Sequence, residues 1–417
     1  MKKFAKVIGI LLAILLLIGL AIGITGYIAF DSMLQDMTAE FIVEKDISLI
    51  VLQDSEILGI KDVKDTDIVG MQDVCFQDSV QRMTKEMEQK TGFLNLQKEY
   101  ESLSAMMNGL YSEDVPIVIL DEAYREIVEL EFPEFSSETR VIFTIQYAQE
   151  QTKFVKRAEE VSEDTFTVLI SGIDTYGEIK TISRSDVNIL AVVNPTEAKI
   201  LLISIPRDYY VPIYSGINSI GRTDGKLDKL THTGIFGPEC TVRTLEKLFD
   251  TTINYYVRVN FTSVVDIVDA IGGITVNSDY AFDSFVVGDN LCDGKKALEF
   301  SRERYQFKDG DRQRGKNQMK VIEAIVNKLT NPSAQYDYVQ LFQAVKQCVQ
   351  MNFSEEEVKT LIQYQIENMP EWSVTSMSVN GSDARDYSFY GGQELYVMYP
   401  DESTIDAAKS SIKEYFK

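Results

Sequence analysis

The chain has very few of the side chains that bind transition metals. Its 417 residues include one histidine and four cysteines, and no two cysteines form a Cys-x-x-Cys pair. Zinc sites need about four such ligands at short spacings, so the sequence disfavours zinc. Outside the cytoplasm Cys240 and Cys292 could pair as a disulfide, or all four cysteines could be buried thiols. The sequence alone leaves both alternatives open.

Positive charge is also scarce. The 41 lysines and arginines stand against 64 aspartates and glutamates, which gives a net charge of −23. Nucleic-acid binding needs a broad basic face, so this composition argues against a nucleic-acid partner.

One segment departs from this acidic background. Residues 302–318 contain four arginines and two lysines: Arg302, Arg304, Lys308, Arg312, Arg314 and Lys316. Crowded cations repel one another and do nothing for a core, so this basic segment predicts a strongly anionic ligand. Arginine suits phosphate well, because its planar fork of donors bonds two oxygens at once.

The N-terminus carries a long apolar run. Residues 7–30 have no charge and follow Lys2, Lys3 and Lys6. As a helix this run would exceed a hydrocarbon core of about 30 Å. A cleaved signal peptide would have a shorter apolar region and a small-residue cleavage site. We therefore expect an uncleaved anchor, with the N-terminus cytoplasmic and the rest of the chain outside.

Composition shifts divide the chain into four parts. We expect a cytoplasmic tip and membrane anchor at 1–30, a smaller α/β accessory domain at 31–160, a catalytic domain at 161–330, and an extension packed on it at 331–417. The accessory domain could be a spacer that lifts the catalytic part off the membrane or a ligand-binding unit.

The expected catalytic domain alternates apolar runs with helical patterns. The apolar runs, which predict strands covered on both faces, are residues 166–173, 187–193 and 200–205. Apolar residues at helical spacing follow in residues 242–249, 264–271 and 319–329. Strands interleaved with amphipathic helices predict a three-layer α/β/α sandwich.

Charged residues stand at the ends of these runs. Asp174 follows the first, Arg184 and Asp186 precede the second, and Arg207 with Asp208 follows the third. Ligands of α/β domains often bind at strand ends, although charges in solvated loops are also common. Because three such charged groups stand at the ends of successive predicted strands, the pattern favours a ligand-binding site.

Five motifs in order resemble the LytR-CpsA-Psr family. They lie at residues 184–186, 204–208, 268–274, 297–304 and 311–318. The resemblance covers about residues 165–330, and the anchor and accessory domain resemble the streptococcal capsule-type members. It implies an α/β sandwich with a hydrophobic pocket for a polyprenyl chain. It also implies a ligase that moves a phosphorylated glycopolymer, such as wall teichoic acid or capsule, from a polyprenyl-pyrophosphate carrier to peptidoglycan.

The resemblance assigns roles residue by residue. The pyrophosphate would be held by Arg184, Arg207, Arg302, Arg304 and Arg314, with Gln318 beside them. Magnesium would bind Asp174 and Asp186. Many members have an Arg-Gln pair where this chain has Asn317-Gln318, which removes one charge that Arg312 or Lys316 could replace.

The chemistry of the residues agrees with phosphoryl transfer. Arginines and Mg²⁺ neutralise phosphate oxygens, and lipid monophosphate is a good leaving group. A sugar hydroxyl needs a base, for which Asp311 is the candidate, although it could equally orient the arginines. The alternatives are a non-enzymatic receptor or transcriptional attenuator that binds lipid-linked intermediates, and a pyrophosphatase that uses water on the same residues.

Overall fold

The computed structural model describes residues 42–72, 77–150, 161–173, 179, 183–214, 225–308, 310–329, 349–368 and 372–417. The apolar run at residues 7–30, Asp174, Cys75 and Cys348 lie outside these ranges, so what the sequence predicts for them stays a prediction. Among the helices of the described ranges, none has the length and apolarity needed to cross a membrane.

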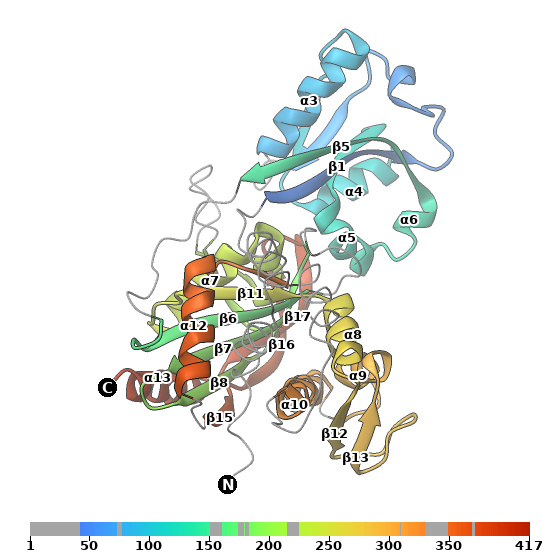
Figure 1. Cartoon of the computed structure of the whole chain (residues 1–417). Helices are drawn as coiled ribbons and strands as arrows, with labels where there is room; N and C mark the ends of the chain where they lie inside the picture. The colour runs from blue at the N-terminus through green and yellow to red at the C-terminus, as the bar shows by residue number, and fades with distance from the viewer. Residues whose placement is uncertain are drawn as a thin grey trace.

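Residues 42–150 fold as a small mixed α/β domain, shown at the top of Figure 1. Its strands lie in the order β3-β2-β4-β1-β5. They are β1 Ile42–Leu52, β2 Val69–Gln72, β3 Gln97–Tyr100, β4 Ile117–Asp121 and β5 Thr139–Glu150. The helical segments are η1 Ile60–Asp62, α3 Gln77–Thr91, α4 Leu103–Tyr111, η2 Glu122–Tyr124, α5 Arg125–Glu131 and α6 Phe135–Glu138. We call this unit the accessory domain.

The second domain is built on a mixed sheet in the order β14-β11-β6-β7-β8-β15. The strands are β6 Phe166–Ile173, β7 Ser185–Asn194, β8 Lys199–Ile205, β11 Tyr255–Val259, β14 Val349–Met351 and β15 Ser373–Ser378. The three apolar runs of the sequence are thus the three central strands β6, β7 and β8. These strands are antiparallel to one another, whereas β11 and β15 join them in parallel.

Helices cover both faces of this sheet, which gives the predicted three-layer sandwich (Figure 1). On one face lie α8 Phe261–Ala270, α9 Gly294–Arg302, α10 Asp311–Leu329 and α12 Glu355–Asn368. On the other lie η3 Leu230–Phe236, α7 Pro238–Phe249 and α13 Glu402–Tyr415. The helical patterns of the sequence correspond to α7, α8 and α10.

Short strand pairs extend the second domain beyond its main sheet. In the described residues these are β9 Tyr210–Ile213 with β10 Lys226–Lys229, β12 Ile274–Ser278 with β13 Gly288–Cys292, and β16 Gly381–Ser388 with β17 Gln393–Pro400. All three pairs are antiparallel.

The C-terminal segment is part of the sheet and not an added extension. Both edge strands, β14 and β15, come from residues after 330, and α12 and α13 cover opposite faces. The domain boundary predicted at residue 330 therefore does not coincide with a boundary of the fold. The two edge strands were not predicted from the sequence, because β14 has only three residues and β15 is largely exposed. Neither therefore shows a buried apolar run.

The two domains share one apolar cluster. The ring of Tyr124 in the accessory domain lies 6.4 Å from that of Phe236, which lies 4.8 Å from Tyr390. Gln393 Nε2 also donates to the Ile127 carbonyl at 3.4 Å. The accessory domain is therefore packed on the second domain rather than only tethered to it.

The disulfide alternative for Cys240 and Cys292 is wrong. Both cysteines are buried, and they are not bonded to each other. Cys240 belongs to the apolar cluster on the α7 face and Cys292 to the cluster on the opposite face, so the sheet separates the two thiols.

Candidate functional site

Three strand ends meet at one edge of the main sheet. Because β6, β7 and β8 form an antiparallel meander, the start of β7 lies between the end of β6 and the end of β8. The register pairs Ile173 with Ser185. Asp186 and Arg207 are therefore neighbours, as the strand-end charges predict. The predicted metal ligand Asp174 lies just past β6, outside the described residues.

This edge opens into a cavity of about 730 Å³. Its charged and amide lining comprises Arg184, Asp186, Arg207, Asp208, Lys229, Asn260, Arg302, Arg304, Lys308, Arg312, Arg314, Gln318 and Asp383. Its apolar lining includes Ile170, Ile173, Val187, Val259, Phe261, Val264, Leu298, Val321 and Ile322. One cavity thus holds all five arginines and the glutamine predicted from the motifs.

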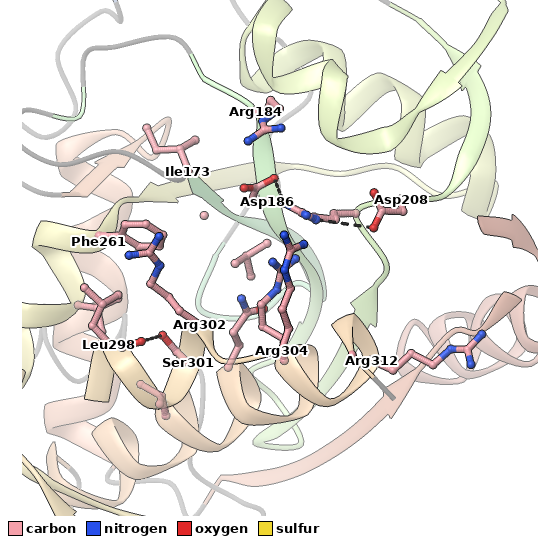
Figure 2. A pocket seen from close by; sticks show the side chains of 18 of the residues that line it. Ile173, Arg184, Asp186, Asp208, Phe261, Leu298, Ser301, Arg302, Arg304 and Arg312 are labelled. Atoms are coloured by element: carbon pink, nitrogen blue, oxygen red, sulfur yellow. Dashed lines mark hydrogen bonds and ion pairs between the residues drawn. The ribbon is translucent and has the colours of Figure 1, made fainter. Parts of the chain in front are cut away.

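The cavity changes character from one end to the other, as Figure 2 shows. Phe261 and Leu298 lie at one end, whereas Asp208 and Arg312 lie towards the opposite end. Arg302 and Arg304 stand between them on the side of α9 and the loop that follows it. The cationic centre therefore has an apolar compartment on one side and a mixed polar one on the other.

Asp186 is a largely buried carboxylate at the cationic centre, with 9% of its side chain exposed. Its Oδ1 lies 2.9 Å from Arg207 Nη1 and accepts a hydrogen bond from Thr231 Oγ1 at 2.8 Å. Burial alone would raise the pKa of Asp186, but Arg207, Arg184 and the Thr231 hydrogen bond hold that pKa below its ordinary value. Asp186 is therefore ionised and fixes the arginines around it.

Asp208 ties the next cations in place. Its Oδ1 lies 2.5 Å from Lys229 Nζ, and its Oδ2 lies 3.7 Å from Arg207 Nε. The side chain is 6% exposed. Asp208 therefore holds Arg207 and Lys229 in place.

Arg302 and Arg304 stand at the end of α9. That helix starts at the Asp293 cap, whose side chain accepts from Lys296 N at 2.8 Å, and ends at Arg302. The Arg302 guanidinium lies 4.2 Å from the centre of the Phe261 ring, a cation–π contact that fixes its plane. Arg304 Nη2 donates to Tyr305 Oη at 2.7 Å, which lowers the pKa of Tyr305.

The first turns of α10 present two faces. Arg314 and Gln318, four residues apart, lie on one face and line the cavity. Asn317 is buried on another face, where its Nδ2 donates to the Phe300 carbonyl at 3.2 Å and its Oδ1 accepts from Gln313 Nε2 at 3.0 Å. Asn317, which stands where many family members have arginine, thus packs against α9.

Of the two cations that could compensate for Asn317, Arg312 lines the main cavity and Lys316 lines a smaller pocket beside it. Asp311, the candidate base, is the first residue of α10. Its side chain lies outside what the structure describes, so its role stays a prediction.

The single histidine is structural. His232 is 1% exposed, and its Nδ1 lies 2.7 Å from Oδ1 of the fully buried Asp228. Asp228 also accepts from Ser388 Oγ at 2.9 Å and from Tyr390 N at 2.8 Å. This network, which we call the Asp228 clamp, joins the β16–β17 hairpin to η3.

Sequence reasoning missed several cavity residues. Lys229, Phe261, Tyr305, Asp383 and Tyr396 all line the cavity. Tyr305 falls inside the basic segment and could have been found there. Asp383 and Tyr396 carry no local signal, because only the folded hairpin brings them to the arginines.

The α/β sandwich thus carries an arginine cluster between an apolar and a polar compartment. The LytR-CpsA-Psr family model matches residues 136–412. The chain belongs to the LytR-CpsA-Psr family.

Two relatives and one solved structure illustrate the similarity. The polyisoprenyl-teichoic acid–peptidoglycan teichoic acid transferase TagU of Bacillus licheniformis is 37% identical over 198 residues, 46% of this chain and 61% of TagU. TagU of Bacillus subtilis is 39% identical over 210 residues, 48% of this chain and 65% of TagU. The crystal structure of protein gbs0355 from Streptococcus agalactiae is 26% identical, with a TM-score of 0.52, over 61% of this chain and 88% of that one. The matched region spans less than two thirds of the two transferases.

Proposed function

We propose that this protein transfers a phosphate-linked wall glycopolymer, of the teichoic acid or capsule type, from a polyprenyl-pyrophosphate carrier to peptidoglycan. The observation that carries the proposal is the single cavity in which Arg184, Arg207, Arg302, Arg304 and Arg314 surround a centre with an apolar compartment beside it. A pyrophosphate fits the cations and a polyprenyl chain fits the apolar compartment. The names of the related transferases support the same chemistry.

The chemistry follows from where charge develops. The acceptor hydroxyl oxygen bonds to the phosphorus that carries the glycan, the bond from that phosphorus to the bridging oxygen breaks, and polyprenyl phosphate leaves. Charge builds on the phosphate oxygens and on the leaving group, which is where a ring of fixed arginines stabilises it. Asp311 is proposed to take the hydroxyl proton. The apolar compartment holds the lipid and limits water, which favours transfer over hydrolysis.

Magnesium is part of the proposal. Mg²⁺ commonly binds through one or two carboxylates together with substrate phosphates and water. Asp186 fits such a site because it is an ionised oxygen ligand that lines the cavity. With Asp174 as second ligand, the ion would neutralise pyrophosphate oxygens. The described residues contain no group of three or more acidic, histidine or cysteine side chains able to hold a metal alone, so the phosphates would complete the coordination.

Asp186→Asn should uncouple pyrophosphate binding from magnesium. In the wild-type protein, Mg²⁺ should strengthen binding of a short polyprenyl pyrophosphate; in Asp186→Asn this gain should fall at least about tenfold. Metal-free binding should be equal or tighter, because a negative charge beside the anion has been removed. Calorimetric titrations with and without Mg²⁺ measure both effects. Asp250→Asn, at the exposed C-cap of α7, is the control, and an intact magnesium gain in Asp186→Asn would remove this residue from the metal site.

Arg302→Ala tests the ligand class. The full-length protein in detergent should bind a short polyprenyl pyrophosphate, and Arg302→Ala should weaken binding about ten- to a hundredfold through loss of charged hydrogen bonds. Lys316→Ala is the matched control from the same basic segment. Its side chain is exposed, so its removal should change affinity by less than about threefold.

The transfer itself is measured with a synthetic lipid-pyrophosphate glycan donor and peptidoglycan fragments. The wild-type protein should form a glycan–peptidoglycan product and release polyprenyl phosphate. Binding of the donor without any product, under conditions with and without Mg²⁺, would contradict the transferase proposal and favour a receptor. Release of free glycan phosphate in place of the product would indicate a pyrophosphatase.

A further inference from the structure

The β16–β17 hairpin forms the cavity wall on the side away from the apolar compartment. Asp383, Tyr396 and Met398 are its lining residues. The register pairs Asp383 with Met398, so both project from the same face as Tyr396, two residues along β17. Met398 N donates to the Asp208 carbonyl at 2.7 Å, which fixes this wall to the segment after β8.

Polar contacts hold the wall in a defined geometry. Tyr396 Oη donates to Asp383 Oδ1 at 3.0 Å, and Arg312 Nη2 lies 3.2 Å from the same oxygen. Arg312 Nη2 also donates to the Gly381 carbonyl at 2.7 Å. Lys229 Nζ lies 6.0 Å from the centre of the Tyr396 ring.

The wall remains open to a ligand. Tyr396 is 40% exposed, and the side chains of Asp383 and Arg312 are 60% and 40% exposed. Burial and the hydrogen bond to Asp383 raise the pKa of Tyr396, so its hydroxyl stays a donor at neutral pH. A flat apolar ring therefore stands among a carboxylate acceptor, a hydroxyl donor and two cations.

This combination fits a sugar ring better than an anion or a lipid. A pyranose has a C–H face that packs on an aromatic ring and equatorial hydroxyls that both donate and accept hydrogen bonds at its rim. A phosphate would gain from Lys229 and Arg312 but would be repelled by Asp383. An alkyl chain would leave the charged groups desolvated without partners.

We propose that the β16–β17 wall is a saccharide subsite that holds the first sugars of the lipid-linked donor, with Tyr396 as the stacking platform and Asp383 as the hydroxyl acceptor. The assignment rests on the proposed function. The pyrophosphate joins lipid and glycan, so a lipid in the apolar compartment and phosphates at the arginines direct the sugar towards the Asp208 and Arg312 end seen in Figure 2. The C-terminal hairpin thereby contributes to donor selection.

The test compares two probes on the full-length protein: a short polyprenyl pyrophosphate without sugar, and the same lipid carrying a disaccharide. Tyr396→Ala should lower the affinity for the saccharide-bearing probe about tenfold and the affinity for the sugar-free probe less than about twofold. Asp383→Asn, which keeps the shape of the side chain, should also weaken only the saccharide-bearing probe. Tyr396→Phe keeps the ring and should lose less affinity than Tyr396→Ala.

Tyr399→Ala is the matched control. Tyr399 lies on the same strand but on the opposite face of the hairpin and is similarly exposed, at 41%. If Tyr396→Ala and Asp383→Asn lost equal affinity for both probes, or lost affinity for neither, the assignment of a saccharide subsite would be overturned. A raised KM for the acceptor glycan with unchanged donor binding would overturn the donor assignment and place the acceptor there. Failure of the wild-type protein to bind the sugar-free probe would count against the proposed function itself.

Discussion

Arg207→Ala should lower the rate of glycopolymer transfer at least about a thousandfold, the size of effect seen when an arginine that stabilises a phosphoryl-transfer transition state is removed. Arg207 is 12% exposed, lines the cavity, and lies between Asp186 and Asp208. Its loss removes a cation from the phosphate site. It also leaves Asp186 with less compensation, so a negative charge faces the anionic substrate.

Single-turnover transfer from the lipid-pyrophosphate donor measures this effect without interference from product release. Arg207→Lys keeps the charge but not the planar fork of donors, so it should lower the transfer rate less than Arg207→Ala does. Arg243→Ala is the control, because Arg243 lies on α7 and pairs with Glu239 at 3.7 Å. A rate in Arg207→Ala above about a tenth of wild type would refute the role assigned to this arginine.

The arginine cluster was predictable because its members belong to the motifs that resemble the LytR-CpsA-Psr family, and three of them stand in the basic segment. Arg207 also follows a continuous apolar strand after one proline, and Arg314 lies one helical turn before Gln318. What the sequence did not reveal is why Asp186 and Arg207 meet. Strand-end sites are usually argued from parallel sheets, whereas here an antiparallel meander brings the end of β8 beside the start of β7.

The polar compartment was not predictable, because its residues are distant in sequence and have ordinary surface composition. Tyr396 and Asp383 reach the cavity only because Met398 pairs with the segment after β8 and the Asp228 clamp holds the start of the hairpin turn. The sequence of β16 and β17 does not show which face of the hairpin lines the cavity. The same holds for the edge strands β14 and β15, whose partners lie far away in the chain.

The accessory domain is coupled to the cavity through the same hairpin. Residues 388–393 contact both the Asp228 clamp and the accessory domain, where Gln393 bonds Ile127. Leu130 of α5, which is 54% exposed, lies in the cavity lining. A purely spacing role would require neither contact, so the packing favours an accessory domain that also shapes the cavity.

Asp228→Asn should destabilise the protein by about 3–5 kcal/mol, because a buried carboxylate with fixed partners is lost and those partners stay buried. Asp228 is 0% exposed and bonds His232, Ser388 Oγ and the backbone N–H of Tyr390. In thermal unfolding this corresponds to a fall of about 10 °C in Tm. Glu394→Gln, an exposed change on the same hairpin, should shift Tm by less than about 2 °C.

The effect should also depend on pH in a defined direction. Burial alone would raise the pKa of Asp228, but His232 and the hydrogen bonds hold that pKa below its ordinary value. A carboxylate with a depressed folded-state pKa stabilises fully above its unfolded pKa of about 3.9, and this stabilisation is lost as pH falls through the folded pKa. The difference in Tm between wild type and Asp228→Asn should therefore shrink as pH falls below about 4. A difference that vanished already between about pH 5 and 7 would show that the carboxylate is not the group that holds the clamp.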